Sequence, residues 1–547
     1  MYEPHAPSRH VQGSPDASVK RRLDIGKSPT ADDDYLIVGD IEMQDKSEAT
    51  KNEPAFDPKL LAMNPIAVTV TSMKARTWKL LRSYPLGMVR AIALAFVLLL
   101  SIAILIRFGR DLRMRVGPYD PVYKVVLDAG STGTRVHVFK FRRRTGEEDL
   151  LLERTSNPEM TFFRKVDGGL SLYKNNPEEA RRGLQWLLEE AASGVPEAVG
   201  AQALLLATAG LRLIPRESAE ELLQVSRSVI RESPFTLVRD DDVAILDGSD
   251  EGLYMWRSVD FSYGRDTNIT TKPSAVVDLG GGSVQLAYRL HEGPEVSPSV
   301  EAKFSEYLRP VHSTGLFSTP SRLRIRDYFL ASAADTSTVS PPHGPLYVHS
   351  WLGYGLEAAR KRILEENVNG TSPCIVPSDS LPEFYDYAGV RLSVHSDDRP
   401  SATRYERCLE VVREALDLDE DCGARDAAEC AFDGAWRGPM DPSNYTFRVF
   451  SYVFDVARAN GLVPSGAHEI VTTVVDFRRV AQQRCWDATA GSSPWACLDA
   501  VYVTSLLSDG FGISDTDPII AAERLTYDDN LLYAAWPLGA ALERLEN

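Results

Sequence analysis

The sequence predicts an α/β protein built from more than one folding unit. Strand-like and helix-like segments alternate after about residue 120, and this alternation is typical of α/β folds. The chain has 547 residues, more than one compact core usually holds, so at least two folding units are expected. The third observation is a pair of glycine-rich turns, each preceded by an apolar strand that ends in aspartate.

The strands and helices that surround these turns can be predicted from hydrophobic periodicity and from turn residues. Strands are expected over residues 124–127, 136–141, 203–207 and 275–278. Helices are expected over residues 177–192, 218–231 and 356–366. A stretch rich in Ser, Thr and Pro, residues 322–345, is expected to be a surface loop.

The amino-terminal part predicts a membrane anchor. Residues 1–85 are rich in Pro, Ser, Asp and Lys without a sustained period, which indicates a disordered tail. Residues 86–107 contain an apolar run with cationic flanks, apolar on all faces, whereas a buried core helix would not need such flanks. A span of ~17–25 residues suffices to cross a bilayer. We therefore predict one uncleaved transmembrane signal anchor over 86–107, followed by a stalk over 108–119.

Features that follow the anchor indicate on which side of the membrane the carboxy-terminal part of the chain lies. Cationic residues are nearly balanced around the run, so they indicate orientation only weakly. By themselves the six cysteines fit either three disulfides in an oxidising compartment or six buried thiols in the cytosol. Together with three glycosylation sequons, they favour a luminal or extracellular catalytic part and a single-pass type II topology. The sequons are at Asn268, Asn369 and Asn444, and the cysteines are Cys374, Cys408, Cys422, Cys430, Cys485 and Cys497.

The two glycine-rich turns carry the predicted chemistry. The first runs from Asp128 to Arg135 and the second from Asp278 to Gln285. Glycines allow backbone N–H groups to approach an anion, and hydroxyls add further donors to phosphate oxygens. The two aspartates can hold a hydrated hard cation, Ca²⁺ or Mg²⁺. The net charge of -17 argues against general nucleic-acid binding, but not against a nucleotide whose phosphates a cation screens.

Two further segments between the turns offer candidate residues. Arg212, which follows Thr208 in the segment 207–212, could clamp a phosphate through two N–H groups. A carboxylate in the segment 250–252 could take a proton from an attacking water. The alternatives are a surface arginine and a solvated acidic turn, and the local sequence does not decide between these readings.

The order of these segments resembles the apyrase family of nucleoside triphosphate diphosphohydrolases, in particular its plant-like apyrase and Golgi nucleoside-diphosphatase branch. The resemblance covers about residues 120–545. Its segments are VVLDAGSTGTRVHVFKF, LLLATAGLRLIP, LDGSDEGLYMW, VVDLGGGSVQLAY, YVHSWLGYGLEAAR, CAFDGAWRGP, LLSDGFGI and AAWPLGAAL. After Trp256 the chain reads Arg-Ser-Val-Asp-Phe, residues 257–261, where relatives usually have Asn-Tyr-Leu-Leu. We expect this stretch to border the cleft, so the departure leaves the substrate preference open.

The resemblance implies a two-lobed actin-, hexokinase- and Hsp70-like fold of the ribonuclease H-like type, with the active site in the inter-lobe cleft. The first lobe would comprise residues 120–247 and 525–547, and the second, with the disulfides, residues 248–524. The resemblance also implies the cysteine pairing. The implied pairs are Cys374–Cys408, Cys422–Cys430 and Cys485–Cys497.

The resemblance further implies a role for each matched residue. Glu251 would be the general base, with Ser283 and Gln285 positioning the attacking water, and Arg135 and Thr208 acting beside the phosphate. Asp128 and Asp278 would hold the metal through water, and Phe454 and Phe511 would sandwich the base, unless they only pack in the core. The expected phosphate-binding residues are Gly130, Ser131, Thr132, Gly133, Thr134, Arg212, Gly280, Gly281 and Gly282.

The expected activity is metal-dependent hydrolysis of nucleoside di- or triphosphates to the monophosphate by direct attack of water. The alternatives are a sugar-kinase-like phosphotransferase on the same superfold and a non-catalytic nucleotide sensor. A Golgi membrane location is favoured, with the cell surface as the alternative. No nucleic-acid partner is expected.

Overall fold

The computed structural model describes most of the chain after residue 120, with some gaps. The described residues are 99, 101, 121–143, 150–155, 160–263, 272–290, 304–309, 345–366, 370–378, 380–397, 399–424, 426–486 and 493–546. The chain divides into two units, 1–101 and 102–547, and the following account concerns the second. The predicted tail and stalk, nearly all of the predicted anchor 86–107, and the predicted loop up to residue 344 lie outside the described residues. Among the residues that are described, none belongs to a helix with the length and apolar character needed to cross a bilayer.

The first sheet is formed by strands from the amino-terminal half of this unit. Its order is β3-β2-β1-β5-β6, and β4 also pairs with β2. Strand β1 pairs antiparallel with β2 and parallel with β5. The strands are β1 (Val122–Ala129), β2 (Gly133–Arg143), β3 (Leu150–Glu153), β4 (Phe162–Asp167), β5 (Gln202–Ala207) and β6 (Val243–Ile245).

The second sheet repeats this arrangement with later strands. Its order is β16-β17-β15-β7-β8-β10-β9, so β10-β8-β7-β15-β17 corresponds strand by strand to β3-β2-β1-β5-β6. As in the first sheet, β7 pairs antiparallel with the next strand, β8, and parallel with a distant one, β15. The strands are β7 (Ser274–Leu279), β8 (Ser283–Arg289), β9 (Leu308–Arg309), β10 (Leu346–Leu352), β15 (Thr446–Ser451), β16 (Glu469–Thr472) and β17 (Ile519–Ala522).

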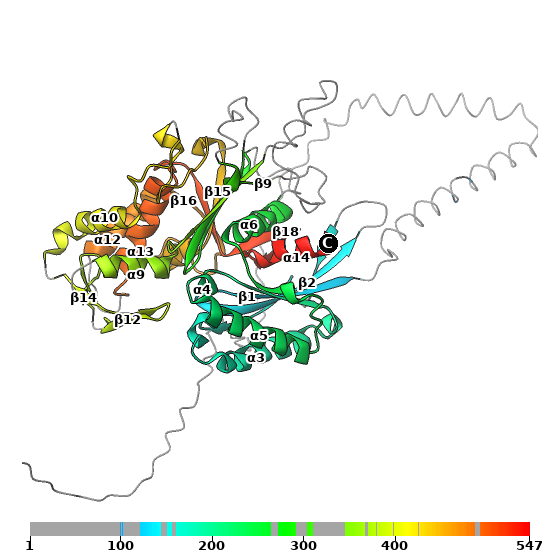
Figure 1. Cartoon of the computed structure of the whole chain (residues 1–547). Helices are drawn as coiled ribbons and strands as arrows, with labels where there is room; N and C mark the ends of the chain where they lie inside the picture. Colours follow the sequence, from blue (N-terminus) through cyan, green and yellow to red (C-terminus); the bar gives the residue numbers. More distant parts are fainter. Residues whose placement is uncertain are drawn as a thin grey trace, which may run out of the picture. The chain divides into compact units, whose positions relative to one another are not determined.

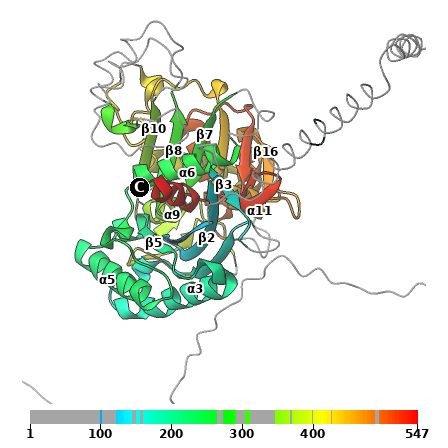
Figure 2. The same cartoon turned by 90° about the vertical axis from the view of Figure 1, so that its right-hand side faces the viewer.

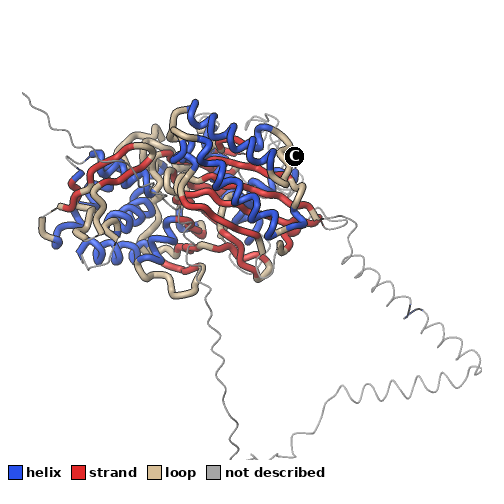
Figure 3. The backbone as a smooth tube through the Cα atoms, turned by 90° about the horizontal axis from the view of Figure 1, so that it is seen from below, coloured by secondary structure: helices blue, strands red, loops and turns tan. Residues whose placement is uncertain are grey.

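Each sheet is covered on one face by its own helices. Helices α3 (Ala180–Gly194) and α5 (Arg216–Glu232) pack on the first sheet, and in the view from below they lie in front of its strands (Figure 3). Helix α3 buries Leu184, Leu187, Leu188 and Ala191, a helical spacing that forms one apolar stripe. The second sheet is covered by α9 (Leu356–Glu366), α10 (Arg404–Ala415), α11 (Tyr452–Ala459), α12 (Val474–Trp486) and α13 (Ala496–Ser505).

The other faces of both sheets share one core with two helices. Helices α6 (Gly248–Tyr263) and α14 (Pro537–Glu546) contact each other and lie side by side between the two groups of strands in both views (Figures 1 and 2). Val126 and Val276 face this shared core, whereas their neighbours in β1 and β7 face the helices of their own sheet. Strands that are buried on both faces explain the continuous apolar runs of the sequence.

The remaining elements are short. Helix α4 (Ala209–Arg212) follows β5, and a π-helical turn (Leu506–Gly510) follows α13. The short strand pairs are β11 (Thr371–Ser372) with β14 (His395–Ser396), β12 (Phe384–Tyr387) with β13 (Val390–Ser393), and β18 (Arg524–Tyr527) with β19 (Asn530–Tyr533). The α/β class is confirmed, and each strand and helix predicted from periodicity is present with boundaries shifted by a few residues.

Candidate active site

The first glycine-rich turn joins β1 to β2. Asp128 pairs with Arg135 in the strand register, and the Gly130 N–H donates to the Gly133 carbonyl at 3.0 Å. A Cβ atom on Gly130 would lie 2.7 Å from Arg135 Nη1 and 3.1 Å from the Gly133 oxygen. A side chain at this position would therefore displace the Arg135 guanidinium from the turn.

The second turn joins β7 to β8 in the same way. Asp278 pairs with Gln285, and the Gly280 N–H donates to the Ser283 carbonyl at 2.9 Å. Gly280 thus closes its turn as Gly130 closes the first one. Because these two N–H groups are used inside the turns, the donors for a phosphate have to come from the residues that follow them.

The two turns touch each other. A Cβ atom on Gly281 would lie 2.6 Å from Ser131 Oγ and 2.8 Å from Thr132 Cγ2, closer than ordinary van der Waals contact. Ser131 and Thr132 are half-buried. The structure therefore brings the predicted phosphate-binding residues of both sheets into one place, at the ends of β1 and β7.

Thr208 and Arg212 lie beside the first turn. The Thr208 N–H donates to the Ala129 carbonyl at 3.1 Å, which ties the start of α4 to the end of β1. A Cβ atom on Gly210 would lie 2.9 Å from Ser131 Cα, so α4 packs directly on the turn. The start of α4 is thus next to the serine that is expected to bind phosphate, whereas the Arg212 guanidinium extends toward Glu251 and lies 3.4 Å from Ser283 Oγ.

Asp128 and Asp278 are both buried, with 7% of each residue exposed. Burial raises the pKa of Asp128 to about 6; the Arg135 guanidinium opposes this rise, and the charge of Asp278 adds to it. Burial likewise raises the pKa of Asp278, while the Ser451 hydroxyl and then Arg135 lower it. Two carboxylates that interact in a buried place are stabilised in their charged form by a cation.

The donor set fits a hydrated divalent cation. Oδ1 of Asp128 is buried and accepts no hydrogen bond from the part of the chain that the structure describes. Its other oxygen lies 3.6 Å from Arg135 Nη1, and Asp278 Oδ1 accepts a hydrogen bond from Ser451 Oγ at 2.6 Å. A buried carboxylate oxygen without a hydrogen-bond partner is unusual and destabilises the folded protein. A water molecule bound to Ca²⁺ or Mg²⁺ would donate the missing hydrogen bond.

Glu251 lies in the first turn of α6, and its carboxylate contacts Arg212 and Gln285. Its Oε2 accepts a hydrogen bond from Arg212 Nη2 at 2.5 Å and one from Gln285 Nε2 at 3.3 Å. Burial raises the pKa of Glu251 to about 8, opposed by Arg212 and reinforced by Asp278 and Asp128. A carboxyl whose pKa is raised toward neutrality suits a general base.

Gln285 is held by two serines. Its Nε2 lies 2.8 Å from Ser283 Oγ and 2.9 Å from Ser350 Oγ. Ser350 is the register partner of Gln285 across the β8–β10 pair. These contacts orient the amide, and they place Glu251, Ser283 and Gln285 close enough to share one water.

Two site residues were not predicted from the sequence. Ser350 lies in the recognised segment YVHSWLGYGLEAAR, but strand register alone brings it to Gln285. Ser451 has a positive φ of 57°, uncommon for serine, and this conformation accompanies its hydrogen bond to Asp278. Since nothing in the local sequence marks either serine, a register prediction across β8–β10 and β7–β15 would have been needed to find them.

Phe454 and Phe511 are placed in the core of the second sheet. The first is 1% and the second 0% exposed, and Phe511 packs against Trp351 and Phe432. This arrangement agrees with the packing alternative, and a base could reach neither ring without rearrangement. The base-binding role that the resemblance implied has no support in this structure.

The segment that departs from the usual family pattern faces the carboxy-terminal helix. Arg257 forms an ion pair with Glu543 of α14, and Ser258 bonds to the chain around α14. These contacts place the Arg257 and Ser258 side chains against the carboxy-terminal segment, and the expectation that the segment borders the cleft stays a prediction. Both side chains point away from the turns because α14 packs along this face of α6.

The cysteine pairing implied by the resemblance is confirmed. The structure contains disulfides Cys374–Cys408, Cys422–Cys430 and Cys485–Cys497. Asn444 is exposed, as a glycosylation acceptor must be. Asn268 and Asn369 lie outside the described residues.

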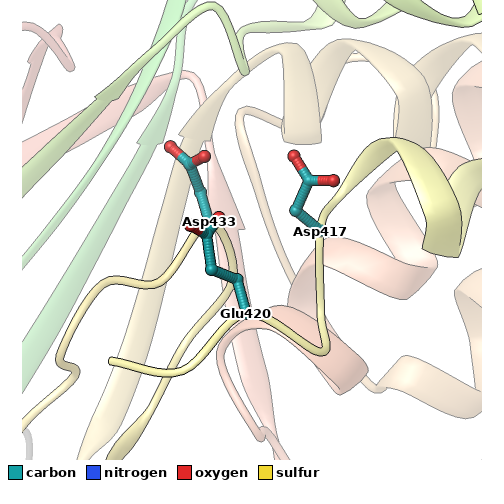
Figure 4. Close-up of side chains that lie close together, drawn as sticks. All are labelled: Asp417, Glu420 and Asp433. Atoms are coloured by element: carbon teal, nitrogen blue, oxygen red, sulfur yellow. The ribbon is translucent and has the colours of Figure 1, made fainter. Parts of the chain in front are cut away.

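A separate carboxylate cluster comes from other elements. Figure 4 shows Asp417, Glu420 and Asp433 close together, with ligand atoms within 4.8 Å of one another. Asp417 already binds Arg362 and accepts a hydrogen bond from the Tyr354 hydroxyl at 3.1 Å. The other two are exposed. We assign no metal to this cluster.

Comparisons with known proteins agree with the geometry. The sequence matches the GDA1/CD39 (nucleoside phosphatase) family over residues 117–313 and 343–547. It is 34% identical over 445 residues to "Probable apyrase 2" of Oryza sativa, covering 78% of this chain and 87% of that protein. It is 30% identical over 440 residues to "Ectonucleoside triphosphate diphosphohydrolase 5" of Bos taurus, covering 78% and 88%.

A solved structure supports the fold. The crystal structure of nucleoside triphosphate hydrolases from Neospora caninum aligns with a TM-score of 0.50 at 15% identity, covering 82% of this chain and 96% of that one. Together with the two sheets of matching topology, this confirms the expected actin- and hexokinase-like α/β fold. From the sequence match and from the paired turns that the structure brings together, the chain belongs to the GDA1/CD39 (nucleoside phosphatase) family.

Proposed function

We propose that this chain, a nucleoside phosphate hydrolase by its family, releases the terminal phosphate of nucleoside di- or triphosphates by direct attack of water. One observation carries the proposal. Glu251, a buried carboxyl with a raised pKa, lies with Gln285 and Ser283 beside two facing phosphate turns. The names of the apyrase and diphosphohydrolase relatives agree with it.

The terminal phosphate would lie between the two turns. Its oxygens would accept hydrogen bonds from hydroxyls and from N–H groups that follow the two turn-closing glycines, and the charge of Arg135 would assist. Such preorganised donors act most strongly on the charge that develops in the transition state. The proposed phosphate contacts are Ser131, Thr132, Gly133, Thr134, Arg135, Thr208, Gly281 and Gly282.

A divalent cation would be held through water by Asp128 and Asp278. The fit rests on the orphaned Asp128 oxygen and on the carboxylate pair described above. When bound, a Ca²⁺ or Mg²⁺ ion screens the phosphate charges and orients them for in-line displacement. We propose this cation as the cofactor.

The chain's own residues would activate the water. Glu251 takes its proton, while the Gln285 amide and the Ser283 hydroxyl hold its oxygen in line with the phosphorus. Water attack breaks the anhydride bond, so the products are inorganic phosphate and the shortened nucleotide, without a phosphoenzyme. Arg212 stabilises the charged form of Glu251 and would contact the phosphate once the proton has moved.

We also propose that the catalytic part acts in a lumen or outside the cell, attached by the anchor predicted over residues 86–107. Three disulfides favour an oxidising compartment, and a relative carries the prefix "ecto" in its name. A Golgi membrane is the favoured location. Imaging of the tagged protein beside Golgi and cell-surface markers tests this, and cytosolic staining would contradict it.

The activity is tested with the full-length, disulfide-intact protein in detergent. Phosphate release is measured from nucleoside mono-, di- and triphosphates, with Ca²⁺, with Mg²⁺ and with a chelator. Metal-dependent release from di- or triphosphates, with monophosphates spared and no acceptor added, is expected. Release only after addition of a sugar acceptor would favour the phosphotransferase instead, and tight nucleotide binding without release would favour the sensor.

A further inference from the structure

The second half of α6 is attached to the carboxy-terminal segment of the chain. The helix carries Glu251 in its first turn and continues to Tyr263. The residues that depart from the usual family sequence, 257–261, lie in this second half. Their contacts with the carboxy-terminal segment show what they do there.

Arg257 is the first of these contacts. Its guanidinium forms an ion pair with Glu543 of α14, and the arginine side chain is only 1% exposed. A buried cation is strongly destabilising unless a carboxylate compensates it. The pair therefore ties this point of α6 to one point of α14.

Ser258 adds hydrogen bonds at the same crossing. Its Oγ accepts a hydrogen bond from the Gly539 N–H at 2.9 Å and lies 3.0 Å from the Ala535 carbonyl. Gly539 is in the first turn of α14, where backbone N–H groups lack a partner inside the helix. Ser258 thus accepts a hydrogen bond from a backbone N–H group at the start of α14, a helix that is far away in the sequence.

The backbones of α6 and α14 approach each other so closely that no side chain fits between them at Gly539. A Cβ atom on Gly539 would lie 2.1 Å from the Tyr254 carbonyl oxygen. One turn further on, the Phe261 ring stacks on Tyr527 at 5.2 Å between centroids. Because these contacts involve successive turns of α6, they oppose both sliding and rotation of the helix.

The amino-terminal end of α6 packs beside the second glycine-rich turn. A Cβ atom on Gly252 would lie 2.9 Å from Val348 Cγ1 and 3.2 Å from Gln285 Cβ, so α6 also packs closely on β8 and β10. Arg257 follows Glu251 by six positions, which is about 9 Å along a rigid helix. A shift of the helix at Arg257 would therefore move the Glu251 carboxylate against Gln285.

We propose that α14 is a positioning element for the general base: the Arg257–Glu543 ion pair and the Ser258 hydrogen bonds set the position of α6, and thereby of Glu251. The proposal rests on the proposed role of Glu251. Arg257, Ser258 and Glu543 are not among the proposed phosphate contacts, so their loss is expected to change the alignment of the water and to leave nucleotide affinity nearly intact.

The test compares Glu543→Gln and Ser258→Ala in the full-length protein with the conservative variant Glu543→Asp. In both test variants kcat is expected to fall on the order of ten- to a hundred-fold while KM changes little, because small misplacements of a catalytic group are costly. Glu543→Asp, which keeps the charge, should recover part of the loss. Glu221→Gln, exposed on α5, is the matched control. All rates are normalised to the folded fraction from circular dichroism.

A second comparison separates positioning from general destabilisation. Combined with Glu251→Gln, the Glu543→Gln change should not lower the residual rate further, because there is no base left to misplace. Unchanged kcat per folded molecule, or a further loss on the Glu251→Gln background, would overturn the proposal. Should Glu251→Gln alone keep full turnover, the assignment of the base fails instead, which is a different outcome. Ser258→Ala decides if Glu543→Gln does not fold.

Discussion

Arg212 Nη2 lies 2.5 Å from Glu251 Oε2, which joins α4 beside the first turn to α6 beside the second sheet. The arginine lowers the pKa of a carboxyl that burial raises to about 8. The strength of the base therefore depends on a cation from another element. The first prediction follows from this pair.

Replacement of Arg212 by Met should shift the acidic limb of the pH profile. Without the guanidinium the pKa of Glu251 rises further above its usual value, so the carboxylate forms only at higher pH. The ratio of wild-type to variant kcat/KM should be larger at about pH 7 than at about pH 9, since a base works only when deprotonated. A ratio that is independent of pH would show that Arg212 binds phosphate without tuning Glu251.

Glu251→Gln should strongly reduce turnover and preserve nucleotide binding. The amide keeps an acceptor for Arg212 but takes no proton, so a loss on the order of 10²- to 10⁴-fold in kcat is expected. Calorimetric titration with a nucleoside diphosphate should give an affinity close to that of the wild type. Glu217→Gln, exposed on α5, is the control. Retained turnover in Glu251→Gln would mean that another group accepts the proton.

Gly281→Ala should disturb the contact between the two turns and reduce activity without unfolding the protein. The added methyl would meet Ser131 Oγ at 2.6 Å and Thr132 Cγ2 at 2.8 Å, so either these two side chains turn away from their present positions or the turns move apart. A loss on the order of ten- to a hundred-fold in kcat/KM is expected from such a displacement.

The matched control for this change is Gly183→Ala in α3. Its Cβ would lie 3.7 Å from Val166 Cγ2, an ordinary contact, and alanine should stabilise the helix by about 0.5–1 kcal/mol. Activity and thermal unfolding are measured for both variants. Equal activities in the two variants would show that the turns tolerate this disturbance.

The disulfides should differ in their contribution to stability. Cys374–Cys408 spans 34 residues and Cys422–Cys430 spans 8. The loop-closure account predicts a loss of about 4 kcal/mol in the free energy of unfolding for the first and about 2.5 kcal/mol for the second when both cysteines become alanine. Denaturant unfolding measures both. The reverse order would show that residual denatured-state structure or packing dominates over loop length.

The sequence alone was sufficient for the features that depend on local order. Apolar runs predict the strands, and the glycines after Asp128 and Asp278 predict the turns, because glycine is among the residues most frequent in turns. The order of the segments identifies the family, and from it follow the fold, the cysteine pairing and the expected role of Glu251.

Only the tertiary structure decided which distant residues complete the site. Ser350 reaches Gln285 through strand register, and Ser451 reaches Asp278 through the end of β15. Phe454 and Phe511 are buried in the core although their segments match the family. Arg257 and Ser258 face α14 rather than the turns. Such contacts depend on sheet register and helix packing between residues far apart in the chain, and local sequence carries no signal for either.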